Sequence, residues 1–170
     1  MLVWLVLAGC KGAEEGPSDV RVDHVPSDSD AESTEPRSCV TADGRVYVAW
    51  QDDRDGTSAV WFNTSDDAGL TWRDKDRQLN SGDAPAFAPA IGCDGDRVHV
   101  AWEDARDGEL AYHNVYVASS DDGGLTWSSD VALDADPEGD AMSVGPAVVA
   151  VGEAAWVAWF DARDGAYDVY

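Results

Sequence analysis

One eight-residue stretch occurs twice and reveals how the chain is organised. SDDAGLTW covers residues 65–72, and SDDGGLTW covers residues 120–127, so the second copy starts 55 residues after the first. Both copies place Ser, Asp, Gly, Thr and Trp at the same spacing. Recurrence at such a period indicates an array of similar structural units.

Three further elements recur with a similar period. An apolar segment that ends in Trp and runs into an Asp-x-Arg-Asp-Gly turn occupies residues 46–56, 98–108 and 155–165. A D-x-x-[VL]-[DN] element occupies residues 19–23, 76–80 and 130–134. A proline precedes each key Trp by about thirteen residues, at Pro36, Pro89 and Pro146. The units therefore lie near residues 36–80, 89–134 and 146–170.

Apolar residues in these segments alternate with a period of two, as in Val46, Val48 and Trp50, and no helical spacing is sustained. Four short antiparallel strands in a unit of this length predict an all-β fold built from propeller blades. In the first unit we expect the innermost strand near Pro36 and the outermost at Arg77–Leu79. Val46–Trp50 and Ala59–Asn63 are expected between them.

The S-x-D-x-G-x-T-W element resembles the Asp-box of the sialidase-type, or BNR-repeat, propellers, and the resemblance covers residues 19–170. It implies that each box forms the hairpin loop between the third and fourth strands, on the face away from the active site. The boxes are therefore expected to be structural. Their residues are Ser65, Asp67, Gly69 and Trp72 in the first copy, and Ser120, Asp122, Gly124 and Trp127 in the second.

The box residues themselves suggest how the loop is held. Gly69 and Gly124 supply a positive φ, and the Asp67 and Asp122 carboxylates accept hydrogen bonds from loop amides with help from the Ser hydroxyls. The two Trp side chains are expected to bury apolar area between neighbouring blades.

The resemblance to sialidases also implies an active site with three arginines, a Tyr–Glu nucleophile pair and an Asp acid/base, drawn from different blades. The Arg-Ile-Pro type of motif is not evident, since Pro36-Arg37 has the reverse order. Arg54, Arg106 and Arg163 instead recur at equivalent positions, beside aspartates with which they can pair. That repetition favours a structural hairpin. The alternative is a ligand-binding rim on the face opposite the Asp-boxes, and no catalytic residue is assigned.

The second unit departs from the repeat by an insertion of three residues around residues 109–114. It brings Glu109, Tyr112 and His113 to the same rim, where an aromatic ring, an imidazole and a carboxylate are able to bind a sugar or a cation. The alternative is a solvated loop.

The chain begins MLVWLVLAGC (residues 1–10), which resembles a bacterial lipobox without the usual basic residues before it. We expect residues 1–9 to be a signal peptide, Cys10 to be acylated, and residues 10–18 to form an acidic tether in the cell envelope. The alternative is a buried apolar strand. The apolar run is too short to span a bilayer.

Cys39 and Cys93 remain after Cys10. Export to an oxidising compartment permits a disulfide between them. They occupy different registers of the repeat, however, so two buried free thiols is the favoured interpretation at this stage.

Thirty-four acidic residues against eleven basic ones give a net charge of −23, which disfavours nucleic acid as a partner. No Cys/His cluster suggests zinc, and no cofactor is expected. Calcium is a further option, because residues 134–140 carry an acid at every other position, loosely like a calcium loop. Pro137 interrupts that loop, and Gly145 stands where the bidentate Glu belongs.

About two and a half blades are present, whereas closed propellers need at least four. We therefore expect a fragment of a larger ring, or an oligomer that completes one. The predicted function is a surface-anchored, sialidase-like propeller that binds a glycan or a protein. The alternative is an exo-α-sialidase or other glycoside hydrolase with most of its active site outside these residues, and a third possibility is a structural role in the envelope.

Overall fold

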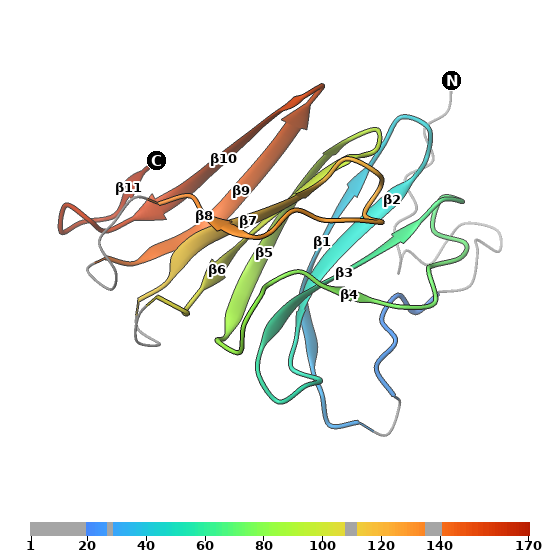
Figure 1. Cartoon of the computed structure of the whole chain (residues 1–170), viewed down its shortest axis with the longest axis horizontal. Coiled ribbons are helices and arrows are strands. Elements are labelled where there is room, and N and C mark those ends of the chain that lie inside the picture. Colours follow the sequence, from blue (N-terminus) through green and yellow to red (C-terminus); the bar gives the residue numbers. More distant parts are fainter. Residues whose placement is uncertain (1–19, 27–28, 108–111, 135–140) are drawn as a thin grey trace, which may run out of the picture.

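The computed structural model describes residues 20–26, 29–107, 112–134 and 141–170. They form three antiparallel sheets that fan out like propeller blades (Figure 1). The first sheet contains β1 (Ser33–Val40), β2 (Val46–Asp52), β3 (Ala59–Ser65) and β4 (Arg77–Gln78). The second contains β5 (Ala86–Asp94), β6 (Arg97–Asp104), β7 (Asn114–Ser120) and β8 (Val131–Ala132). The third contains β9 (Ser143–Val151), β10 (Ala154–Asp161) and β11 (Asp168–Val169).

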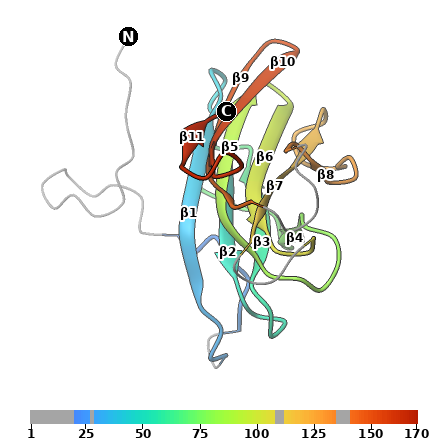
Figure 2. The same ribbon diagram turned by 90° about the vertical axis from the view of Figure 1, so that its left-hand side faces the viewer.

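The strands of each sheet pair in the order in which they follow along the chain. The first strands lie next to one another, β1 against β5 and β5 against β9, while β4 and β8 lie away from them (Figure 2). This arrangement confirms the predicted all-β, partial propeller and its order of strands. The described residues contain no helix, and so none that could cross a membrane.

The core between the first two blades is formed by side chains at alternate positions of their strands. In the first blade, Tyr47 and Ala49 face the second blade. In the second blade, Val98, Val100 and Trp102 face the first. Neighbouring blades therefore meet through opposite faces of their strands. The main buried residues are Tyr47, Ala49, Val60 and Phe62 from the first blade, and Val98, Val100, Trp102 and Ala118 from the second. Burying each large side chain contributes about 1.5–3 kcal/mol.

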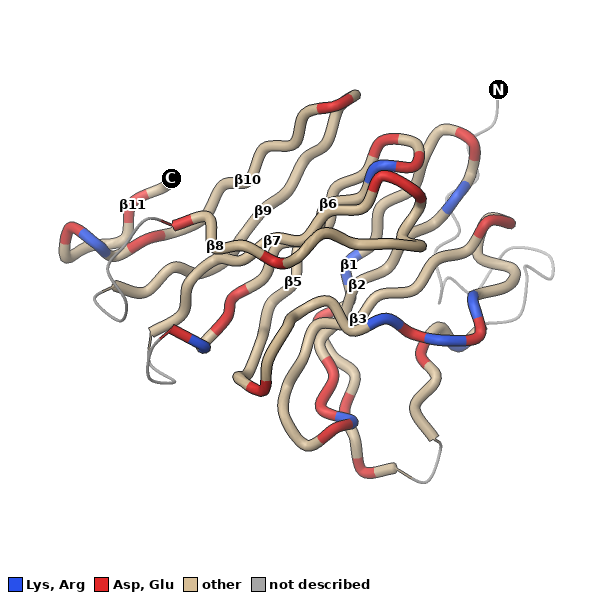
Figure 3. The backbone as a smooth tube through the Cα atoms, viewed as in Figure 1, with Lys and Arg blue, Asp and Glu red and all other residues tan. Residues whose placement is uncertain are grey.

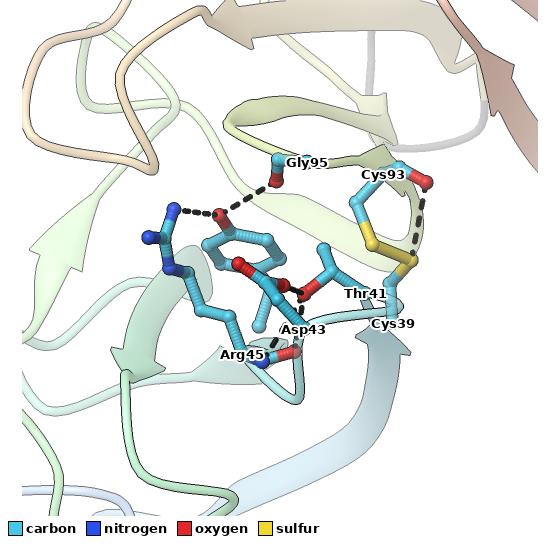
Figure 4. Close-up of a disulfide and its surroundings, with 7 residues drawn as sticks. Cys39, Thr41, Asp43, Arg45, Cys93 and Gly95 are labelled. Carbon is cyan, nitrogen blue, oxygen red and sulfur yellow. Dashed lines mark hydrogen bonds between the residues drawn. A yellow bond between two sulfur atoms is a disulfide. The ribbon is translucent and has the colours of Figure 1, made fainter.

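A disulfide joins Cys39 of β1 to Cys93 of β5, so the expectation of free thiols is wrong (Figure 4). Cys39 lies opposite Tyr47 and Cys93 lies opposite Val98, which face each other across the blade junction. Because facing blades use opposite sides of their strands, cysteines offset by one register point toward each other. The offset that argued against pairing is the condition that allows it.

The three prolines mark bulges in the first strands. The register of each first strand shifts at this point, and the residue before each proline has a positive φ: 53° at Glu35, 46° at Ala88 and 64° at Gly145. The freed amide points at the preceding blade. Ala88 N donates to Gln51 Oε1 at 3.4 Å, and Gly145 N donates to Glu103 Oε1 at 2.9 Å. The bulges therefore place polar contacts between blades.

One face of the third blade is apolar and exposed. Trp156 occupies the position equivalent to Tyr47, yet 57% of its surface is exposed, whereas Tyr47 is fully buried against the second blade. Val149, Val151 and Phe160 are also exposed. In the first blade, the corresponding face is covered by its neighbour.

Residues 20–26 form no strand, although residues 19–23 match the outermost-strand element of the repeat. They lie along the first blade instead. His24 N donates to Asp76 Oδ2 at 2.8 Å, and Val22 helps to line a cavity of about 230 Å³ beside Val48 and Trp50.

We expect the Cys39→Ser/Cys93→Ser double variant to lose about 2–4 kcal/mol of unfolding free energy, because the cross-link closes a long loop in the unfolded chain. Urea denaturation, monitored by tryptophan fluorescence, measures the loss. Reductant should lower the wild-type stability to that of the variant and leave the variant unchanged. An equal effect of reductant on both proteins would contradict the assignment.

Candidate functional site

A buried aspartate ends the second strand of each blade. Asp52, Asp104 and Asp161 are at most 1% exposed. Each accepts a hydrogen bond from the indole Nε1 of the Trp two residues earlier, at 3.4, 2.9 and 3.2 Å respectively. Each also accepts the backbone N–H of the Arg two residues later, at 2.8, 3.0 and 2.8 Å. The aspartate thus fixes the turn that starts the next hairpin.

The arginine of this turn reaches outward as well. Arg54 Nη1 lies 2.7 Å from Asp76 Oδ2, and Arg106 Nη2 lies 2.6 Å from Asp130 Oδ2. These outer aspartates begin the D-x-x-[VL]-[DN] elements. The repeated Arg therefore connects two repeated motifs that the sequence presents as separate.

Each guanidinium also stacks on an aromatic ring of the third strand or its equivalent. The guanidinium carbon lies 4.1 Å from the Trp61 centroid for Arg54, 4.2 Å from that of Tyr116 for Arg106, and 4.1 Å from that of Tyr170 for Arg163. Cation–π contact of this kind adds to the ion pairs.

The last residue of the same element binds the backbone. Asn80 Oδ1 accepts the N–H of Val60 at 2.9 Å, and Asp134 Oδ2 accepts the N–H of Val115 at 3.1 Å. A side-chain oxygen therefore takes the place of a strand partner where the short outer strand has ended. This explains why the element requires Asp or Asn at that position.

The electrostatics of the turn favour permanent charge. Burial raises the pKa of Asp52, but hydrogen bonds from Arg54 and Ser33 outweigh it and lower that pKa to about 2. Burial lowers the pKa of Arg106, and its hydrogen bonds to Asp104 and Asp130 reverse this to a net increase. The guanidinium groups are thus engaged within their own blades, as the structural interpretation expects. A role for Arg54, Arg106 and Arg163 in a ligand rim stays a prediction.

A different cluster lies between the second and third blades, where the repeat symmetry is broken. His113 Nδ1 lies 3.0 Å from Glu103 Oε2, and the other oxygen of Glu103 accepts the N–H of Gly145. The His113 ring stacks on Phe87 with centroids 5.2 Å apart. The carbonyl of His113 accepts Ser143 N–H at 2.7 Å. We call Phe87, Glu103, Tyr112 and His113 the rim cluster.

The rim cluster lies at the end of the blades opposite the Asp-boxes. Glu103 and His113 are mostly buried, with 13% and 12% of their side chains exposed, whereas Tyr112 is 41% exposed. The cluster therefore combines an accessible aromatic ring, on the residue before His113, with a carboxylate–imidazole pair that is hydrogen-bonded to the third blade. Such a surface can stack on an apolar face and donate or accept hydrogen bonds. Glu109 lies outside the described residues.

Sequence reasoning found Tyr112 and His113 but missed Glu103 and Phe87. A usable signal was present, because the residue between the repeated Trp and Asp differs in every unit. It is Gln51, Glu103 or Phe160. Phe87 pairs with Glu103 across the bulged strand, so only the register places it there.

Both Asp-boxes form the predicted loop. In the first, Ser65 Oγ donates to Asp67 Oδ1 at 2.7 Å and accepts Gly69 N–H at 2.8 Å. Asp67 accepts Thr71 N–H at 2.8 Å and Thr71 Oγ1–H at 2.6 Å. The second box, from Ser120 to Thr126, repeats these four bonds within 0.1 Å.

The glycines and tryptophans of the boxes differ in how far their roles extend. Gly69 and Gly124 have φ of 87° and 81°. A Cβ on Gly124 would clash with the Phe62 ring, so this glycine also permits the blades to approach. Trp127 packs edge-on against Phe62, 4.9 Å between centroids, as expected for a residue between blades. Trp72 is half-buried, and an inter-blade role for it stays a prediction.

Some predicted sites fall outside the described residues. These are Cys10 with the signal peptide and tether, and most of the acidic stretch 134–140. Among the residues that the structure does describe, no three His, Cys, Asp or Glu side chains are grouped to hold a metal ion.

Comparison with known proteins supports the fold. No family model matches the sequence, and no curated protein matches it. Among solved structures, the Hadza microbial sialidase Hz136 aligns with a TM-score of 0.52 and 14% identity, over 81% of this chain and 37% of that protein. The GH93 α-L-arabinofuranosidase of Fusarium graminearum, in complex with arabinobiose, aligns with a TM-score of 0.52 and 15% identity, over 80% and 49%. This chain thus spans less than half of either protein and shares their fold.

Replacement of Arg106 by Gln should destabilise the second blade by about 3 kcal/mol, because it leaves the buried carboxylates of Asp104 and Asp130 without their cation. Arg97→Gln removes the same charge from an exposed pair and should change the unfolding free energy by less than about 1 kcal/mol. Urea denaturation compares the two variants. Equal losses of unfolding free energy in the two variants would show that the buried ion pairs of Arg106 stabilise the fold no more than an exposed pair does.

The Asp-boxes predict a loss of stability in acid. Hydrogen bonds, foremost from the side chains of Thr71 and Thr126, lower the pKa of Asp67 and Asp122 to about 2. The pKa of an Asp in the unfolded chain is about 3.9, so the folded chain binds fewer protons. The stabilisation is therefore full above about pH 4 and is lost as the pH falls through about 2.

The urea midpoint, measured across that pH range, tests this expectation. Asp122→Asn should flatten the decline, whereas Asp121→Asn, which changes the neighbouring exposed residue, should leave the wild-type profile intact. A wild-type profile in Asp122→Asn would contradict the role of the box carboxylate.

Proposed function

We propose that this protein is a sialidase-like β-propeller that binds a glycan through the rim cluster of its second blade, at the junction with the third. The observation that carries the proposal is the three-residue insertion, which only the second unit has among the three rim turns of this sequence. The repeated Arg and Asp residues build the blades, whereas the positions of Phe87, Glu103 and His113 hold other residue types in the other units, and Tyr112 belongs to the insertion.

The chemistry of the rim cluster supports a sugar as the ligand. Sugars combine apolar ring faces with hydroxyl groups, and the cluster combines an exposed tyrosine ring with a mostly buried imidazole–carboxylate pair. Sites of this composition fix a ligand by a few placed polar groups among aromatic ones. A protein ligand at the same surface is the other form of the binding hypothesis.

We further propose that the chain is exported and held by a lipid on Cys10 at the bacterial cell envelope. The Cys39–Cys93 disulfide supports export, because such cross-links persist in oxidising compartments and are rare in the cytosol. The lipobox-like sequence before Cys10 supports the anchor.

A glycoside hydrolase, such as an exo-α-sialidase, is the second candidate. Its support is the shared fold with a sialidase and with an arabinofuranosidase that was solved with arabinobiose. Against it stands the use of Arg54, Arg106 and Arg163 inside the blades, where a carboxylate clamp would need free guanidinium groups.

A glycan microarray probed with the full chain tests binding. We expect retained glycans, and we expect Tyr112→Ala to weaken their binding at least about tenfold through loss of the accessible ring. Leu70→Ala removes an exposed apolar side chain from the opposite face and should bind like the wild type. Equal binding by the two variants would remove the rim cluster from the proposal.

The same preparations, incubated with a fluorogenic sialoside, separate binding from catalysis. Binding without turnover supports the module. Turnover that is lost in Tyr112→Ala but kept in Leu70→Ala supports the hydrolase instead.

A further inference from the structure

A second, unrelated cavity lies between the outer part of the first blade and the Asp-box loop of the second. Its volume is about 260 Å³. The first blade contributes Phe62, Thr64 and the segment that leads to β4, and the second contributes Gly124 and Leu125. The cavity is at the end of the blades opposite the rim cluster, and the proposed function makes no use of it.

Three cationic side chains line this cavity, namely Arg73, Lys75 and Arg77. They alternate with acidic residues along the segment leading to β4 (Figure 3). Within the described residues, none of the three forms an ion pair. Every other described arginine does so: Arg21, Arg37, Arg45, Arg54, Arg97, Arg106 and Arg163.

That contrast is unexpected in a chain of net charge −23, where acidic partners are abundant. Asp76 lines the same cavity, but its two oxygens already bind Arg54, His24 and Asn63. It therefore does not neutralise the three cations. Three unpaired positive charges held around one cavity favour an anionic ligand.

The cations also break the repeat. After Trp72 the first blade continues RDKDRQ (residues 73–78), whereas after Trp127 the second continues SSDVAL (residues 128–133). The aspartate that binds the arginine of the turn is present in both segments, so the blade does not require the cations. Of the two units in which this segment can be compared, only the first has the cations, and this favours a role other than folding.

An independent observation concerns Thr64, which also lines the cavity. Thr64 is 1% exposed, and its hydroxyl has no hydrogen-bond partner among the described residues. A buried hydroxyl without a partner costs free energy, and a turn of the Thr64 side chain toward an acceptor bound in the cavity would recover it. An oxyanion offers such an acceptor.

We propose that this cavity is an oxyanion-binding site that takes a sulfate or phosphate group. Arg73 and Arg77 supply planar guanidinium donors that match the oxygens of such a group, and Lys75 adds a compact charge. Phe62 and the exposed Leu125 provide an apolar wall against which the carrier of the group packs. The group comes either as the free ion or as an ester on a sugar.

Isothermal titration of the full chain with inorganic sulfate and with inorganic phosphate, at low and matched ionic strength, tests the site. We expect saturable binding of one ion with a Kd of about 1 mM or lower. Arg73→Gln/Lys75→Gln/Arg77→Gln should weaken binding at least about tenfold. Arg21→Gln/Arg37→Gln/Arg97→Gln removes the same three charges from exposed pairs and should stay within about twofold of the wild type.

Equal weakening in both triple variants would overturn the proposal, because it would reduce the effect to net charge. Absence of saturable binding of either ion by the wild type would overturn it as well. Should the cavity variant lose its fold by circular dichroism, Lys75→Gln alone, at an exposed position, should weaken binding at least about threefold, and no change would count against the site.

Glucose 6-sulfate, compared with inorganic sulfate and with glucose, distinguishes the sources of the group. Tighter binding of the ester indicates a sulfated sugar packed on Leu125, and equal binding indicates the free ion. Both results support the site, whereas binding of glucose as tight as that of its sulfate would contradict it.

Discussion

The buried aspartate at the end of each second strand is the constraint on which this architecture depends. A single carboxylate binds the indole of the strand, the amide of the turn and the guanidinium that reaches the outer edge of the blade. Without it, the outer strand would be held by a short ladder, since β4 and β8 are two residues long, and by the side-chain bond of Asn80 or Asp134. The Trp, the turn and the outer motif therefore form one interaction network rather than three separate motifs. The network also explains why the arginines recur in every unit.

Much of the fold could be predicted because each repeated motif satisfies its own bonds locally. The hydrogen bonds of an Asp-box link residues four apart or fewer, so its spacing alone predicts the loop. The strands were also predictable, because the alternation of apolar side chains along each strand reflects burial on the two faces of a single blade. The pairing of Arg54 with Asp76 was not predicted, because it depends on how far the third strand returns along the blade. Residues 20–23 show a similar limit, since the motif matches but no strand forms.

The contacts between blades were harder to predict. Cys39 and Cys93 seemed mismatched because the repeat was compared position by position, as if equivalent residues should meet. Neighbouring blades meet through opposite faces of their strands, so a residue contacts one that is offset by one position in the repeat. The same rule places Glu103 beside Gly145 of the next blade, a contact that no single unit displays. Sequence reasoning found Tyr112 and His113 through the insertion. It missed Glu103, which lies at a repeated position of varying residue type, and Phe87, which its pairing with Glu103 places there.

The two junctions between the first strands close by different means. At the first junction the sulfurs of Cys39 and Cys93 bridge the strands, with the Cα atoms 6.0 Å apart. At the second, a Cβ on Gly92 would lie 2.9 Å from a methyl carbon of Val148 and 3.1 Å from the amide nitrogen of Ala150. Gly92 has no side chain, so its backbone packs directly against the Val148 side chain and the backbone of Val149 and Ala150. Two blades that share a common plan thus have different mechanical limits. The first junction resists pulling until a covalent bond breaks, whereas the second yields by separation of two surfaces, so an extending force would detach the third blade before it parted the first two.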